Sequence, residues 1–339
     1  MSPPSVERVR RVPVLPPREP ETHKAQVGRI LVLAGSRGMS GAAVLAARGA
    51  LRGGAGLVRV LAPASAQPLI AGSEPCLMSV PLPEDEHGRV GPEALDVVRK
   101  SFDWGDVLAT GPGLGCAESV ARLVRDALAA WDRPAVIDAD AINNLATLDR
   151  EELTHLAQAS GGQPPSAGDA RHGGQPPSAG DGGPSPPTVR PRWVFTPHPG
   201  EARRLAKALE LEIQPTGDDD VRVAAAAELA SRLGSVVVLK GRRTVVCDGQ
   251  KAYINRSGNP GMATGGMGDV LTGLIAALIG QKLEPFDAAV LAVHVHGLAA
   301  DLAARQIGPV GYLARDVAEL LPAALRDAAN TQMGFHSTR

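Results

Sequence analysis

The chain has 339 residues, of which 44% are hydrophobic and 21% charged, a composition typical of a globular protein of one large or two modest domains. A formal net charge of -1 and an aromatic content of 3% argue against a nucleic-acid partner, because basic surface and stacking rings are both scarce. Three cysteines without CxxC spacing, no secretory leader and no long apolar run predict a cytoplasmic protein with reduced thiols and no membrane segment.

Residues 1–24 are rich in Pro, Arg and Glu, and we expect an extended arm with little structure of its own. The pattern then changes to short apolar runs that alternate with helical stretches. The predicted order is strand RILVLAGS (29–36), helix GAAVLAARGALRGGAG (41–56), strand LVRVLAP (57–63), strand DVLATGPGLG (106–115), helix SVARLVRDALAAW (119–131), strand AVIDAD (135–140), strand WVFTPH (193–198), helix EARRLAKALE (201–210) and strand SVVVLKG (235–241).

A different pattern follows in TVVCDGQKAYIN (244–255), where Asp248-Gly249 between two β-prone runs predicts a late β-hairpin. After the glycine-rich stretch GNPGMATGGMGDVLTGLIAAL (258–278) the chain is predicted to be helical, through AAVLAVHVHGLAADLAAR (288–305) and an ending around DVAELLPAAL (316–325). Continuous apolar strands separated by helices indicate an α/β fold with a mainly parallel sheet covered on both faces.

One segment does not fit this alternation. GGQPPSAGD occurs at 161–169 and again at 173–181, among residues that are almost all Gly, Pro, Ser, Ala and Asp. Such a duplication buries too little apolar surface to offset its ordering entropy. We therefore predict a disordered surface insertion at about 160–191, inside one domain of residues 25–330 that is followed by a tail at 331–339.

Ligands of an open parallel sheet bind beyond the carboxyl ends of its strands, and here nearly every predicted strand ends in Gly, Asp, His or Lys. A dehydrogenase is the first hypothesis, but the glycines at 35, 38 and 41 are spaced GxxGxxG, and no acid ends the next strand. The phosphate-binding motif GxxxxGK[ST] is also absent from the sequence.

The stretch GNPGMATGGMGDVLTGLIAAL (258–278) allows two interpretations. Its glycines form a simple turn with Asp269 as a helix N-cap, or they present bare N–H groups to an anion beside a chemically active Asp269. Phosphoryl transfer agrees with the second interpretation, because it requires amide donors for phosphoryl oxygens and a base for the attacking hydroxyl.

Taken together, these motifs resemble the ADP- or ATP-dependent NAD(P)H-hydrate dehydratases, whose fold is similar to that of ribokinase. The resemblance extends from about His23 to about Val317. It rests on THKAQVGRILVLAGSRGMSGAAVLAARGALRGGAGLV (22–58), ATGPGLG (109–115), VIDADAIN (136–143), TPHPGEARRL (196–205) and NPGMATGGMGDVLTGLIAAL (259–278).

The resemblance implies a three-layer α/β/α sandwich and a repair reaction. The S-form of NADH or NADPH hydrated at nicotinamide C6 would be dehydrated with ADP, or ATP, as co-substrate and Mg2+ as cofactor, giving AMP and phosphate from ADP. Phosphorylation of the C6 hydroxyl would turn a poor leaving group into a good one. Relatives also imply a homotetramer, and with no room for an epimerase domain ahead of this one we expect a separate epimerase as the functional partner.

The resemblance also implies roles for individual residues. Asp269 would be the catalytic base and contact the substrate. The hydrated dinucleotide would be bound by Ala42, Gly113, His198 and Glu201. The nucleotide would be bound by Lys240, Gly241, Arg242, Arg243, Thr244, Gly265, Gly266, Met267 and Gly268, with Gly266 to Gly268 forming the anion hole. Asp138 and Asp140 would orient the metal through water.

Two alternatives remain open at this stage. A ribokinase-like kinase that acts on a vitamin hydroxymethyl group with ATP would use Asp269 in the same way. A catalytically silent nucleotide sensor would bind the nucleotide and perform no chemistry. Met267 also departs from the family pattern, in which Thr is frequent, although a backbone N–H tolerates this change.

Overall fold

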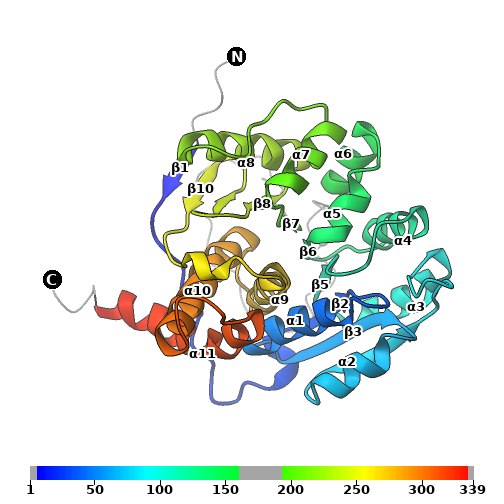
Figure 1. The fold of residues 1–339 in the computed structure, drawn as a ribbon, viewed down its shortest axis with the longest axis horizontal. Helices are drawn as coiled ribbons and strands as arrows, with labels where there is room; N and C mark the ends of the chain where they lie inside the picture. Colours follow the sequence, from blue (N-terminus) through cyan, green and yellow to red (C-terminus); the bar gives the residue numbers. More distant parts are fainter. Residues whose placement is uncertain (1–5, 160–192, 335–339) are drawn as a thin grey trace, which may run out of the picture.

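The structure is a computed structural model of the 339-residue chain, and it describes residues 6–159 and 193–334. The predicted insertion at about 160–191 lies outside the described residues. Within the described parts, ten strands form a single sheet in the order β1-β10-β9-β8-β7-β6-β5-β2-β3-β4, flanked by helices on both sides (Figure 1). Every pair from β8 through to β4 is parallel, whereas β9 runs antiparallel to both β8 and β10.

The elements follow the predicted alternation of short strands and helices. The strands are β1 (Glu7–Val9), β2 (Arg29–Leu33), β3 (Leu57–Pro63), β4 (Met78–Leu82), β5 (Val107–Thr110), β6 (Ala135–Ile137), β7 (Trp193–Phe195), β8 (Val236–Leu239), β9 (Val245–Cys247) and β10 (Lys251–Ile254). The helices are α1 (Ser40–Arg52), α2 (Gln67–Ser73), α3 (Leu95–Lys100), α4 (Glu118–Ala129), α5 (Ala139–Leu145), α6 (Arg150–Ala159), α7 (Pro199–Ala208), α8 (Asp219–Leu233), α9 (Met267–Gly280), α10 (Pro285–Gln306) and α11 (Ala314–Gly334). Short 3-10 turns lie at η1 (Lys24–Val27), η2 (Pro92–Ala94), η3 (Phe102–Trp104) and η4 (Pro260–Met262).

The central strands are buried on both faces, because alternate side chains of a strand point to opposite sides of the sheet. In β2, Ile30 and Val32 belong to one core, together with residues of α1, α9, α10 and α11. Leu31 and Leu33 belong to a second core, with residues of α3 to α8. This arrangement confirms the predicted three-layer α/β/α architecture with a mainly parallel sheet.

The helices α1 and α9 approach each other at backbone distance, because glycines stand at their contact. A Cβ atom on Gly273 of α9 would lie 1.8 Å from the carbonyl oxygen of Ala46, and one on Gly49 of α1 would lie 2.2 Å from the carbonyl oxygen of Val270. No side chain fits in either place. The contact fixes the position of α9, whose first turn carries Asp269.

The late hairpin is confirmed. β9 and β10 pair antiparallel around Asp248 and Gly249, and Gly249 has a φ of +91° that glycine adopts without strain. The N-terminal arm differs from the expectation of little structure, because Glu7–Val9 form β1, which pairs parallel with β10. This strand has three residues, of which two are charged, so its sequence pattern is too weak to predict a strand.

Two helices also differ from the sequence analysis. Contrary to the expectation of no long apolar run, α10 is long and apolar enough to cross a membrane by length and composition. Two-thirds of its apolar window is buried inside the molecule, as in the core helix of a globular domain. The last helix, α11, continues to Gly334, past the predicted domain end at residue 330.

Candidate active site

The loops after β2 and β5 meet at the carboxyl edge of the sheet, where the sequence places Ala42 and Gly113. Ser36 donates a hydrogen bond from its hydroxyl to the carbonyl oxygen of Gly113 (2.8 Å), which ties the two loops together. A Cβ atom on Gly113 would lie 3.0 Å from Cβ of Ala42 and 2.9 Å from Cβ of Met39. The two predicted substrate positions are thus neighbours on one surface that only small residues can form.

A buried ion pair lies at the ends of β6 and β8. Lys240 Nζ is 2.5 Å from Asp138 Oδ1, and the hydroxyl of Thr272, on α9, donates to Asp138 Oδ2 at 2.7 Å. Burial alone would raise the pKa of Asp138, but Lys240 and the hydroxyls of Thr272 and Thr196 lower it below its ordinary value. Burial likewise disfavours the charged form of Lys240, and its acidic neighbours raise its pKa above the ordinary value. Both groups are therefore charged at neutral pH.

Glu201 and His198 form the capping box at the start of α7. The Glu201 side chain accepts from the backbone N–H of His198 (2.7 Å), while His198 Nδ1 accepts from the backbone N–H of Gly200 (2.9 Å). Glu201 is buried and lies 3.8 Å from Lys240, whereas half of the His198 side chain is exposed. Burial and the charge of Asp138 raise the pKa of Glu201, although Lys240 opposes the shift. Both predicted residues are held rigidly at this edge of the sheet.

Asp269 lies in the first turn of α9, half-buried and close to the same charges. None of the side-chain hydrogen bonds in the described part of the chain involves its carboxylate. Burial, followed by repulsion from Asp138, raises the pKa of Asp269 to about 7, against the opposing effect of Lys240. The N-cap interpretation of Asp269 is wrong, because the N-cap of α9 is Gly266. A carboxylate with a pKa near neutrality suits a general base.

The turn before Asp269 has the geometry of an anion site. Gly266 adopts a φ of +86°, and α9 begins at Met267, so the N–H groups of Met267, Gly268 and Asp269 lack acceptors within the helix. Those donors lie one residue later than the predicted set of Gly266 to Gly268, and the Met267 side chain is buried in the core. A Cβ atom on Gly268 would lie 3.3 Å from Lys240 Nζ, which places the ammonium beside the turn. Amides, helix dipole and ammonium together favour a phosphate.

Asp140 orders the loop that follows β5. Its Oδ2 accepts from the backbone N–H of Gly115 (2.8 Å), and its Oδ1 faces the Cys116 thiol (3.5 Å). Between Asp140 and Asp138, Ala139 has a φ of +47°, a strained conformation that turns the two carboxylates to different partners. No group of three or more His, Cys, Asp or Glu side chains within residues 6–159 and 193–334 could hold a metal ion.

The segment from Lys240 to Thr244 forms the tight loop between β8 and β9. The Lys240 backbone N–H donates to the carbonyl of Pro197 (2.8 Å), and the Thr244 hydroxyl donates to the carbonyl of Gly241 (2.9 Å). The buried guanidinium of Arg222, from α8, donates to several carbonyls of the loop. Arg242 and Arg243 are exposed at the loop's tip, where the sequence analysis places nucleotide contacts.

Sequence reasoning missed two residues of this site. Thr272 hydrogen-bonds to Asp138 across 134 positions, and Arg222 supports the Lys240 loop from a helix that the sequence analysis does not predict. An arginine among the apolar residues of RVAAAAELASRL is the single pattern that could have indicated Arg222.

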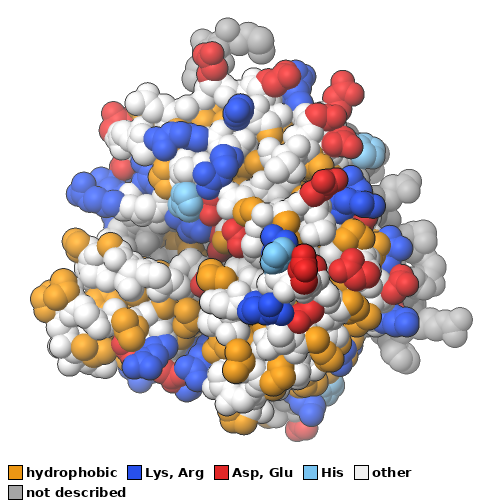
Figure 2. Space-filling model, turned by 45° about the vertical axis from the view of Figure 1, so that its right-hand side comes forward, with side chains coloured by type: hydrophobic (Ala, Val, Ile, Leu, Met, Phe, Trp, Pro, Cys, Tyr) orange, Lys and Arg blue, Asp and Glu red, His pale blue; other side chains and the backbone are white. Residues whose placement is uncertain are grey.

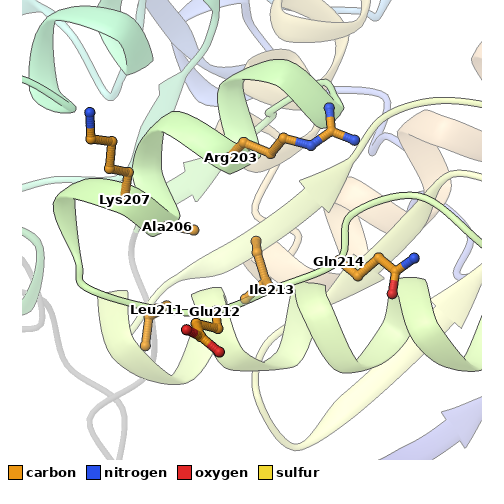
Figure 3. A pocket seen from close by; sticks show the side chains of 7 residues that line it. All are labelled: Arg203, Ala206, Lys207, Leu211, Glu212, Ile213 and Gln214. Carbon is orange, nitrogen blue, oxygen red and sulfur yellow. The ribbon is translucent and has the colours of Figure 1, made fainter.

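The surface around these elements has no dominant charge. Figure 2 shows Lys, Arg, Asp and Glu side chains interspersed over one face, in agreement with the net charge near zero. A groove of ≈ 560 Å³ lies elsewhere, between α7 and the segment that follows it (Figure 3). Its lining consists of Arg203, Ala206, Lys207, Leu211, Glu212, Ile213 and Gln214. It contains none of the predicted site residues, so we place the site at the strand ends.

Similar structures share the fold. The ADP/ATP-dependent NAD(P)H-hydrate dehydratase from Bacillus subtilis, co-crystallised with ATP and Mg2+, is 28% identical with a TM-score of 0.66, over 93% of this chain and 95% of that chain. A ribokinase-like superfamily protein from Enterococcus faecalis has a TM-score of 0.69 at 24% identity, over 93% and 92% of the two chains, which shows the fold alone.

Similar sequences agree with this likeness. The bifunctional NAD(P)H-hydrate repair enzyme Nnr of Moorella thermoacetica is 42% identical over 315 residues, which is 92% of this chain and 52% of that protein. The enzyme of the same name from Escherichia coli is 37% identical, over 89% of this chain and 48% of that protein. The chain thus spans about half the length of the relatives it matches. The family model described as NAD(P)H-hydrate dehydratase matches residues 30–158 and 185–323, and the chain belongs to this family.

Proposed function

We propose that this protein dehydrates the S-form of hydrated NADH or NADPH with ADP as phosphoryl donor, releasing AMP and phosphate. Family membership and the repair enzymes among its relatives support this proposal. The observation that carries it is the half-buried carboxylate of Asp269, with a pKa raised to about 7, beside free helix amides and the Lys240 ammonium. A base and an anion site at one helix terminus suit phosphorylation of an alcohol.

The proposed reaction has two steps. Asp269 takes the proton of the C6 hydroxyl as the hydroxyl oxygen bonds to the terminal phosphorus of ADP, and the bond from that phosphorus to its bridging oxygen breaks to leave AMP. The ring nitrogen then donates its electron pair and expels phosphate from C6. Loss of the C5 proton restores the C5=C6 double bond, so the net change is removal of water at the expense of one phosphoric anhydride.

The same geometry supports the assignments around the base. We propose that the small surface of Ala42 and Gly113, with His198 and Glu201, receives the hydrated dinucleotide. ADP would be bound by two segments, Lys240 to Thr244 and Gly265 to Gly268. In the second segment, the N–H donors for phosphate would be those of Met267 to Asp269. Mg2+ bound to the phosphates would neutralise part of their charge, with Asp138 and Asp140 acting on it through water.

The test is recovery of reduced nicotinamide absorbance from hydrated NADH, with Mg2+ and either ADP, ATP or no nucleotide. The proposal predicts recovery that requires a donor and is fastest with ADP. Asp269→Asn should retain ADP binding and lose turnover by several orders of magnitude, because the hydroxyl then has no base. Phosphorylation of a vitamin hydroxymethyl alcohol without any recovery would instead establish the kinase, and tight ADP binding without either reaction would establish a nucleotide sensor.

We also propose a cytoplasmic homotetramer that acts together with an epimerase. All three cysteines are free thiols, in keeping with a reducing compartment. Large apolar side chains are exposed at Leu69 and along the loop that carries Ile307, Val310 and Leu313, and such a surface supports self-association. Light scattering coupled to size exclusion tests the tetramer, with a monomer as the contrary result.

A further inference from the structure

Arg222 is a buried arginine to which the proposed reaction gives no role. It lies in the first turn of α8 with 6% of its surface exposed, and its guanidinium points at the loop between β8 and β9. Nη2 donates to the carbonyl oxygens of Leu239 (3.0 Å) and Lys240 (3.1 Å). Nη1 donates to the carbonyl oxygens of Arg243 (2.8 Å) and Arg242. One side chain therefore binds four carbonyls within the five consecutive residues from Leu239, at the end of β8, to Arg243.

These bonds dictate where the loop's amide groups point. In a trans peptide the N–H lies opposite the carbonyl, so the N–H groups of Gly241 and Arg243 point away from the guanidinium. Within the described chain, no hydrogen-bond acceptor is found for either N–H. Gly241 has a φ of +131° and Arg243 a φ of +58°, which shows that the chain bends sharply to direct its carbonyls inward.

Outward-pointing amides of a tight turn are donors of the kind that bind anions. The loop's charge surroundings support this assignment. Arg243 pairs with Asp219 at 2.5 Å, which anchors the loop to the start of α8, and Lys240 at the start of the loop holds its ammonium next to Gly268. The loop amides and the α9 turn are thereby linked through a single residue, Lys240.

We propose that Arg222 is a positioning residue, which fixes this loop so that the amides of Gly241 and Arg243 meet phosphate oxygens of the nucleotide. The identity of the ligand as ADP rests on the proposed function. We place Arg222 itself away from the substrate, because Nη1 and Nη2 both donate to loop carbonyls. A buried arginine is suited to this task, since its planar fork supplies several donors in fixed directions and stays charged.

The first experiment compares Arg222→Lys with Arg232→Lys by calorimetric titration of ADP, in the absence of hydrate. A lysine keeps the charge but cannot reach four carbonyls, and we expect a rise in the ADP dissociation constant on the order of tenfold, which corresponds to losing one charge-assisted hydrogen bond. Arg232 lies on the same helix, and its side chain makes one hydrogen bond within the described part of the chain, of 3.5 Å to the carbonyl of Leu209, so its variant should bind like the parent. Equal ADP affinity in R222K at an unchanged Tm would overturn the inference.

A second measurement needs no variant. Amide hydrogen exchange at Gly241 and Arg243 should be fast in the free protein and slow once ADP is saturating, because the phosphates supply the missing acceptors. Exchange that ADP leaves unchanged at both amides would also overturn the inference. A merely structural Arg222 would lower Tm and the active fraction while leaving the ADP affinity of the folded protein intact. Failure of the parent protein to dehydrate hydrated NADH would instead refute the proposed function, whatever the titrations with ADP show.

Discussion

The raised pKa of Asp269 predicts how activity depends on pH. The base must be ionised to take the hydroxyl proton, and a pKa of about 7 means that roughly one site in a hundred is ionised at pH 5. We therefore expect kcat/KM, which reports ionisation of the ligand-free enzyme, to fall about tenfold for each pH unit below 7 and to reach a plateau above it. A carboxylate with an ordinary pKa would already be fully active at pH 5.5. The fall in rate below pH 7 is thus a direct consequence of the burial of Asp269 and of the neighbouring acids, which raise its pKa.

The assay is restoration of reduced nicotinamide absorbance at pH values from 5 to 9, with ADP and hydrate below saturation so that the rate reports kcat/KM. Reactions with Asp269→Asn at each pH measure the background change in absorbance that does not depend on Asp269. His198→Gln is the variant that distinguishes the two candidate bases. If Asp269 is the base, the residual activity of His198→Gln should still fall below pH 7. If the His198 imidazole is the base, that pH dependence should disappear. A rate independent of pH between 5.5 and 8 would refute the assignment of Asp269.

Three further substitutions test the supports of the site. Gly273→Ala places a Cβ 1.8 Å from a carbonyl of α1 and should lower the free energy of unfolding by about 2–3 kcal/mol in urea titration, whereas Gly72→Ala, with open space around it, should not. Thr272→Val removes the 2.7 Å bond to Asp138 and should cost about 1–3 kcal/mol at pH 7. Because the folded pKa of Asp138 lies below its unfolded value, its stabilisation is present at neutral pH and lost as pH falls below about 3.9, so the difference between T272V and the parent should shrink in acid. Asp301→Asn weakens the carboxylate that holds the loop before the α9 turn, including the N–H of Gly258 (3.0 Å), and should lower kcat on the order of tenfold with little change in Tm.

The fold was predictable where apolar runs and helical periodicity alternate, as from β2 to β3, from β5 to β6 and from β7 to α7. Two strands were not predicted, and in each case the local sequence explains why. β4 contains Pro81 within MSVPL, which argues against a strand in the middle of a sheet, and β4 in fact lies at the sheet's edge, where proline is tolerated. β1 has three residues and gains its hydrogen bonds from β10, more than 240 positions away, so its own sequence carries little information.

The site was predictable to the extent that the ends of parallel strands share one edge. That rule alone brings Gly113, Asp138, His198 and Lys240 together, although they span more than a hundred residues of sequence. The rule does not indicate which side chains interact with one another at this edge. Whether Asp138 faces a metal or Lys240 depends on side-chain geometry, and the structure shows the ion pair with Lys240.

Charge balance explains why these particular groups are combined. Asp138, Glu201 and Asp269 bring three carboxylates to one lysine, in a site proposed to receive a polyanionic nucleotide. Asp138 and Lys240 neutralise each other, and near neutral pH Asp269 is partly protonated, which reduces the repulsion of an incoming phosphate. In the proposed site, further attraction would come from neutral amides, at the first turn of α9 and in the loop held by Arg222, which provide positive potential without a titratable group. If the site receives a phosphate as proposed, main-chain dipoles would supply attraction in place of additional lysines, whose charge would lower the pKa that the proposed base requires.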